Sequence, residues 1–199
     1  MLHAVLAVLV RADALISAGH EGRPASCARF PARACNLGAA GEREWTPIVA
    51  DAATRVLRAH GVKVLREPAD FGGTYAVGMA IFVHFDGTAP PCGSGASIGY
   101  DDAAGAAAAY RWRELYAPLI PYRFMPDNFT SGLHHYYGFR QVHARDGALV
   151  LEMGEITCPT QHAWMATRLE LLGELLAYFV SRSIGKGDVP LPAKFADQR

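Results

Sequence analysis

Three apolar runs of strand length constrain this chain most, because each one leads directly into a residue that can bind a metal or transfer a proton. Residues 14–18 lead into Gly19-His20-Glu21-Gly22, residues 80–83 into His84, and residues 148–151 into Glu152-Met153-Gly154. Apolar runs bounded by turn residues are typical of buried strands in a parallel sheet. The carboxyl ends of such strands meet at one edge. We therefore expect these polar side chains to gather there.

A helix is predicted between the first two runs. Thr46 suits the N-cap, Pro47 suits the first helical position, and apolar residues recur at helical spacing up to Ala59. Gly61 suits the position after the helix end, and residues 62–65 follow as a strand. Strand, loop, helix and strand form a βαβ unit with a parallel strand pair. Helices are also predicted over residues 101–116 and 162–183.

Length and composition narrow the class of protein. A chain of 199 residues, about half of them hydrophobic, suffices for one domain with a substantial core. The formal net charge is zero and the arginines are dispersed, so no nucleic-acid partner is expected. Residues 2–10 are apolar but too short to span a membrane. Arg11 and Asp13 follow at once, which favours a short buried strand or helix over a signal peptide.

The four cysteines show no Cys-x-x-Cys spacing, which makes a structural zinc knuckle improbable. Cys27 and Cys35 lie in a long irregular segment, residues 23–41, that we expect to form a rim beside His20. These two cysteines can form a disulfide outside the cytoplasm or remain free thiols, and the sequence leaves both open.

A metal site can be assembled from the ends of these elements. His20, His84 and Glu44, which stands just before the predicted helix, supply two imidazoles and a carboxylate. This set leaves an open position on tetrahedral zinc, as in catalytic zinc sites. Glu152 is then available as a general acid–base. The residues therefore predict a zinc hydrolase.

Three further side chains are weaker candidates for substrate contact. His134 and His135 are adjacent in a segment expected to be extended, so at most one of them faces a given site. A polar loop without a binding role is the alternative for this pair. Asp86, two residues after His84, is the third candidate.

The order of these motifs resembles the zinc-dependent N-acetylmuramoyl-L-alanine amidases of the amidase-3 type. Ile16-Ser17-Ala18-Gly19-His20-Glu21-Gly22 is similar to that family's first-ligand stretch, and Phe82-Val83-His84-Phe85-Asp86 to its second histidine stretch. Val150-Leu151-Glu152-Met153-Gly154 is similar to the stretch with its catalytic glutamate, and Glu44-Trp45 before a helix to its carboxylate ligand. Glu42 remains an alternative to Glu44.

The resemblance implies one catalytic domain over residues 1–184 and a polar tail over residues 185–199. It implies an α/β fold with a mixed, mostly parallel sheet flanked by helices. It also implies a Zn²⁺ enzyme that hydrolyses the amide between N-acetylmuramic acid and L-alanine in peptidoglycan. We expect a monomer without a membrane span that acts at the bacterial cell wall, as a phage lysin does.

Two alternatives stay open. One is a zinc amidohydrolase or carboxypeptidase acting on a small N-acyl amino acid or another peptide, for which a closed pocket is expected rather than a groove. The other is an inactive relative that only binds peptidoglycan. Glu152 argues against the second alternative, because a binding module needs no buried group for proton transfer.

Overall fold

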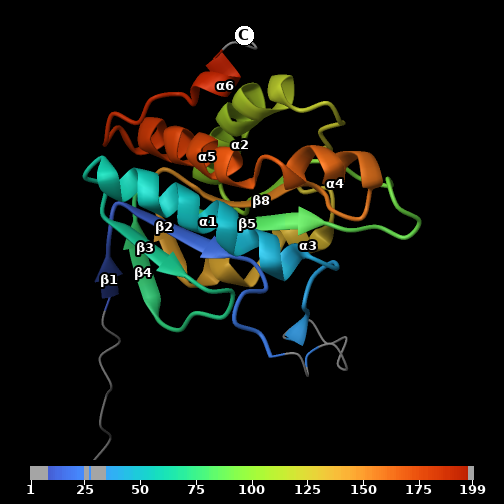
Figure 1. Cartoon of the computed structure of the whole chain (residues 1–199). Helices are drawn as coiled ribbons and strands as arrows, with labels where there is room; N and C mark the ends of the chain where they lie inside the picture. Colours follow the sequence, from blue (N-terminus) through green and yellow to red (C-terminus); the bar gives the residue numbers. More distant parts are fainter. Residues whose placement is uncertain (1–8, 25–26, 28–34, 197–199) are drawn as a thin grey trace, which may run out of the picture.

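The sheet of the predicted α/β fold is present and mostly parallel. A computed structural model describes residues 9–24, 27 and 35–196 (Figure 1). Its main sheet has the order β3-β2-β5-β8-β6, formed by Val64–Glu67, Ala14–Ala18, Met79–Asp86, Ala148–Glu155 and Ser97–Gly99. Only β6 is antiparallel to its neighbour. The expectation of a mixed, mostly parallel sheet is confirmed.

A smaller parallel sheet lies against one face of the main sheet. It has the order β1-β4-β7, formed by Leu9–Arg11, Thr74–Val77 and Val142–Ala144. Its side chains share a buried cluster with alternate residues of the main sheet, namely Leu15, Ala80, Phe82, Ala148 and Val150. The other residues of the same strands point to the opposite face, as the two-residue period of a strand requires.

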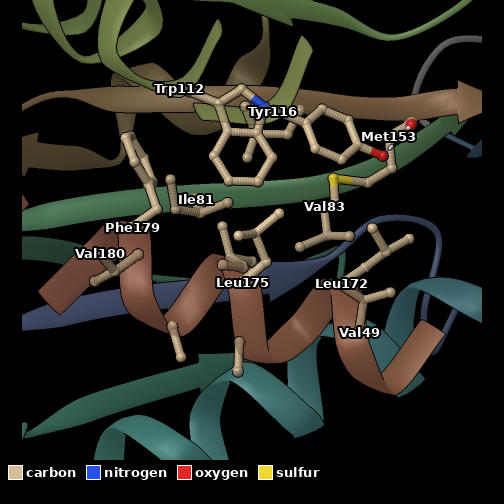
Figure 2. Packing of buried hydrophobic residues seen from close by; sticks show 14 of the residues in the cluster. Val49, Ile81, Val83, Trp112, Tyr116, Met153, Leu172, Leu175, Phe179 and Val180 are labelled. Carbon is tan, nitrogen blue, oxygen red and sulfur yellow. Dashed lines mark hydrogen bonds between the residues drawn. The ribbon is translucent and has the colours of Figure 1, made fainter. Parts of the chain in front are cut away.

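Helices cover that opposite face. The helices here are α1 (Glu42–Ala59), α2 (Ala103–Tyr116), α4 (Pro159–Ala166) and α5 (Leu169–Ile184), and Figure 1 shows them gathered on one side of the sheet. Trp112, Tyr116 and Phe179 pack against strand residues such as Ile81 and Val83 (Figure 2). This core is almost fully buried, so it holds the strands that end at the candidate site.

The helix α1 begins five residues before the predicted start. Gly41, with a φ of 89°, is its N-cap, whereas Thr46 and Pro47 lie within the helix. The Thr46 hydroxyl donates to the Gly19 carbonyl at 2.6 Å and ties the helix to the loop after β2. The end after Ala59 and the following glycine agree with the prediction. Because of this shift, Glu42 and Glu44 both lie in the first turn of the helix.

The region near the carboxyl end differs from the prediction in two places. The helix predicted over residues 162–183 is two helices, α4 and α5, interrupted at Thr167 and Arg168. The segment after residue 184, expected to be a polar tail, includes α6 (Ala193–Ala196), and its Val189 and Phe195 are buried in the core. These two apolar residues make the segment part of the packed structure.

The remaining elements are short. They are the 3₁₀ helices η3 (Ala117–Leu119) and η4 (Tyr137–Arg140) and the helix α3 (Ser131–His134). At the other end of the chain, Leu9 and Val10 in β1 are exposed rather than buried as expected, and residues 2–8 lie outside the described part. None of the helices in the described part is long and apolar enough to cross a membrane.

Candidate metal centre

His20, Glu42 and His84 converge at the carboxyl edge of the main sheet. Glu42 Oε1 lies 3.3 Å from His20 Nε2 and 2.9 Å from His84 Nδ1. The three possible ligand atoms all lie within 4.8 Å of one another, and all three residues are buried. Among the described residues, this is the group whose geometry suits a metal ion.

The carboxylate at this site is Glu42, which corrects the expected Glu44. Because α1 begins at Glu42, residues 42 and 44 are about 200° apart around the helix axis. Glu42 therefore faces the histidines, while Glu44 is exposed and pairs with Arg43 at 3.2 Å. With the helix expected to begin at Pro47, both glutamates lay before it, and the helical phase that separates Glu42 from Glu44 was not evident from the sequence.

His20 is held by the turn after β2. Its φ of 62° is uncommon for a residue with a side chain, and residues in such backbone conformations cluster at functional sites. Its Nδ1–H donates to the Asn36 carbonyl at 2.7 Å, since a carbonyl oxygen only accepts. Arg23, buried beside it, donates to the same carbonyl at 2.6 Å. This arrangement leaves the lone pair of His20 Nε2 directed toward Glu42.

His84 lies on β5, on the face of the sheet opposite the helical core. Its ring packs directly on Gly19, where any side chain would overlap the imidazole. Its Nδ1 faces Glu42, and its Nε2 lies 3.1 Å from the Tyr136 hydroxyl. Burial lowers the pKa of His84, although Glu42 opposes this. This direction favours the neutral imidazole, the form that binds metals.

Glu42 is an ionised carboxylate despite its burial. Burial alone raises its pKa, but the hydrogen bonds and positive charges that His20 and His84 supply when they are protonated outweigh this and lower the pKa to about 2. The backbone N–H groups of Ala39 and Phe85 donate to its oxygens at 2.9 and 3.2 Å. Two imidazole nitrogens and one charged oxygen are a donor set that zinc prefers. The residues present therefore fit a zinc ion.

Glu152 lies beside this group. In the parallel pairing of β5 and β8, it is the partner of His84 and lies on the same face of the sheet. Its Oε2 is buried without a hydrogen-bond partner among the described residues. Burial, followed by the charges of Glu42 and Asp86, raises the pKa of Glu152 well above its usual value. A cation at the neighbouring group would favour its carboxylate form.

The four residues line one cleft that is open to solvent and has a volume of about 470 Å³. Asp86, Thr88 and Thr157 also line it. The structure therefore brings the predicted His20, His84, Glu152 and Asp86 together. His134 and His135, by contrast, are exposed at the end of α3, where His134 Nδ1 donates to the Tyr100 carbonyl. Neither histidine lines the cleft.

Both sides of the cleft carry a disulfide. Cys27–Cys35 closes the rim segment on the His20 side, so the structure resolves the alternative that the sequence left open. Cys92–Cys158, which was not predicted, joins the loop after β5 to the start of α4. Both bonds agree with an oxidising environment. Asn36, Arg23 and Tyr136 were also missed, since no local motif marks their contacts with the histidines.

Comparison with known proteins identifies the fold. No protein-family model and no curated protein sequence matches this chain. The solved catalytic domain of the N-acetylmuramoyl-L-alanine amidase CwlV from Bacillus (Paenibacillus) polymyxa var. colistinus is 14% identical, with a TM-score of 0.63 over 92% of this chain and 100% of that one.

Two further structures give the same result. The N-acetylmuramyl-L-alanine amidase Ami1 from Mycobacterium smegmatis is 18% identical over 88% of this chain and 97% of that one, with a TM-score of 0.59. The catalytic domain of the CD27L endolysin, which targets Clostridia difficile, is 14% identical over 86% and 97%, with a TM-score of 0.58. This chain has the fold of these cell-wall amidases.

Proposed function

We propose that this protein is a zinc-dependent N-acetylmuramoyl-L-alanine amidase that hydrolyses peptidoglycan. The observation that carries the proposal is the buried His20–Glu42–His84 group, which opens into a cleft beside the free carboxyl oxygen of Glu152. The same fold occurs in solved amidases of this activity. Action at the bacterial cell wall follows from this substrate.

His20 Nε2, Glu42 Oε1 and His84 Nδ1 would hold the metal, because these atoms converge and the other nitrogen of each imidazole has its own partner. A zinc ion bound there supplies Lewis acidity, which activates a water molecule and polarises the scissile carbonyl. A cleft with an open position at such a site is typical of hydrolytic zinc centres.

Glu152 is the proposed general acid–base. As the water oxygen attacks the carbonyl carbon, the Glu152 carboxylate accepts a proton from the water. It then delivers that proton to the alanine nitrogen as the carbon–nitrogen bond breaks. The reaction consumes one water and yields a free carboxylic acid and a free amine. Without this proton the nitrogen would be a very poor leaving group.

Metal analysis of purified protein, paired with hydrolysis of purified cell walls, tests the proposal. Wild-type protein is expected to contain one zinc per chain and to release new L-alanine amino groups from the walls. His20→Ala and His84→Ala should each lower the metal content well below one. Glu42→Gln should do the same, while its matched control Glu44→Gln should retain zinc and activity, because Glu44 is exposed.

Two outcomes would contradict the proposal. A metal-loaded wild type that leaves cell walls intact but cleaves small N-acyl amino acids would favour a small-molecule amidohydrolase. The open cleft argues for the polymeric substrate instead. A folded wild type that binds no zinc would overturn the metal site itself.

A further inference from the structure

In the two proposed histidine ligands, the ring nitrogen that faces away from Glu42 has a different kind of hydrogen-bond partner. His20 Nδ1 donates directly to a backbone carbonyl, that of Asn36, which can only accept a hydrogen. His84 Nε2 instead meets the hydroxyl of Tyr136 at 3.1 Å, a group that can either donate or accept. Arg23 Nη1 also lies 3.2 Å from His20 Nδ1, but it donates to the same carbonyl at 2.6 Å, so the closer Asn36 carbonyl sets the tautomer of His20. The tautomer of His84 depends instead on where the Tyr136 hydrogen points.

A chain of hydroxyl groups determines that direction. The Tyr136 hydroxyl lies 3.3 Å from the Tyr137 hydroxyl, and the Tyr137 hydroxyl donates to the carbonyl of Ala69. Since this carbonyl only accepts, the Tyr137 hydrogen is already used, and its oxygen is left to accept from Tyr136. The oxygen of Tyr136 can then accept a hydrogen from His84 Nε2.

This row of hydroxyl groups is surrounded by packed aromatic rings. Tyr136 contacts Phe82, Tyr137 and Phe139 with ring-centroid distances of 4.9, 4.5 and 5.9 Å. Ala69, at its far end, is buried, and its N–H donates to the Glu21 carbonyl. The hydroxyl groups are thus held by the fold rather than by local sequence.

Metal binding through Nδ1 requires that the hydrogen of the neutral His84 ring be on Nε2. Without a cation, its Nδ1–H can donate to Glu42 at 2.9 Å. A cation that takes the Nδ1 lone pair requires the neutral imidazole to carry its hydrogen on Nε2 instead. That hydrogen then needs an acceptor in a buried place, because an unpaired buried N–H costs free energy.

We propose that Tyr136, supported by Tyr137 and the Ala69 carbonyl, is a positioning residue that accepts the Nε2 hydrogen of His84 and so makes Nδ1 the ligand atom. The inference rests on the proposed metal site. Partners behind metal-binding histidines orient the ring and fix its tautomer, and their loss commonly weakens metal binding 10–100-fold.

Tyr136→Phe tests this role, because it removes the hydroxyl and retains the ring. The matched control is Tyr75→Phe. Tyr75 is a buried tyrosine of the cluster against which the partly buried Tyr136 packs, and its hydroxyl donates to a backbone carbonyl, that of Gly72, at 2.9 Å. Zinc affinity is measured by competition with a chromophoric chelator. We expect it to fall about 10–100-fold in Tyr136→Phe and to stay close to wild type in the control.

Tyr137→Phe provides a second variant that leaves Tyr136 in place. Without its acceptor, the Tyr136 hydroxyl is free to donate to His84 Nε2, which favours the tautomer that cannot bind through Nδ1. Zinc affinity should therefore fall in this variant too. Melting curves of the metal-free proteins show whether each variant remains folded.

Nitrogen-15 NMR of histidine-labelled, zinc-loaded wild type gives a readout other than affinity. We expect the His84 signals to report a metal-bound Nδ1 and a hydrogen on Nε2. A metal-bound Nε2, or unchanged zinc affinity in folded Tyr136→Phe, would overturn the role of Tyr136 while leaving the amidase proposal intact. A wild type that binds no zinc would instead show that the metal site itself is wrong.

Discussion

Two glutamates on β8, only three residues apart, have opposite surroundings. Glu155 is fully buried and accepts hydrogen bonds from the backbone N–H groups of Cys92 and Ser94 at 2.6 and 2.7 Å. It also accepts from three hydroxyl groups, those of Thr88, Ser94 and Thr157. Glu152 is half-buried, and its Oε2 lacks a hydrogen-bond partner within the described part of the chain.

The difference appears in their proton affinities. Burial alone raises the pKa of Glu155, but these hydrogen bonds outweigh it and lower the pKa to about 2. Burial also raises the pKa of Glu152, and no such hydrogen bonds oppose it there. A carboxylate satisfied by fixed donors holds a loop in place, whereas one left unpaired beside the proposed metal site can take up and release a proton. The hydrogen bonds, not the strand, separate the two roles.

The largest expected effect is on turnover in Glu152→Gln. The amide has nearly the same volume and cannot accept the proton, so cell-wall hydrolysis should fall by at least 10²–10⁴-fold. Zinc content should stay at the wild-type level, since Glu152 is not among the three converging residues that are the proposed ligands. A folded, zinc-loaded Glu152→Gln protein with near-normal activity would remove the distinction between the two glutamates.

Removing the Cys92–Cys158 bond tests what else holds the loop bound to Glu155. The bond closes a loop of 66 residues. In the chain-entropy model its loss in the double variant Cys92→Ser, Cys158→Ser costs about 4 kcal/mol of unfolding free energy. Cys27→Ser with Cys35→Ser, whose separation is 8, should cost only about 2.5 kcal/mol. Equal losses in denaturant titrations would contradict this order.

Glu155→Gln should reduce stability with little effect on chemistry. Several charge-assisted hydrogen bonds become weaker, for which we expect a loss of about 3 kcal/mol in unfolding free energy and about 6–12 °C in Tm. Turnover per folded, zinc-loaded molecule should remain within the same order of magnitude. A loss of turnover as large as that of Glu152→Gln, without a change in Tm, would mean that both glutamates take part in the reaction.

The smallest expected effect is a pH dependence of that stability difference. Because the pKa of Glu155 falls from 4.5 to about 2 on folding, its contribution is fully present above pH 4.5 and is lost as the pH falls through about 2. The gap in unfolding free energy between wild type and Glu155→Gln should therefore narrow from about pH 5 down to about pH 3. A gap that is constant with pH would show that Glu155 acts only through packing.

The sequence alone predicted the central strands and the gathering of their polar residues at the carboxyl edge of the sheet. The apolar runs before His20 and His84 and around Glu152 are long enough to define buried strands. The two-residue period then places His84 and Glu152 on one face once their strands pair in parallel. A short stretch of sequence is enough to show that a strand is buried and on which face each of its side chains lies.

Only the tertiary structure decided which glutamate faces the histidines. The helix starts five residues before the predicted position, so both glutamates lie within it, with Glu42 turned inward and Glu44 outward. The tertiary structure alone paired Cys92 with Cys158 and placed Tyr136 behind His84, across sequence separations of 66 and 52 residues. The contrast between Glu152 and Glu155 was also hidden, since the backbone donors to Glu155 come from a distant loop. Contacts of this kind depend on how the loops pack around the sheet, and no local pattern of residue types encodes them.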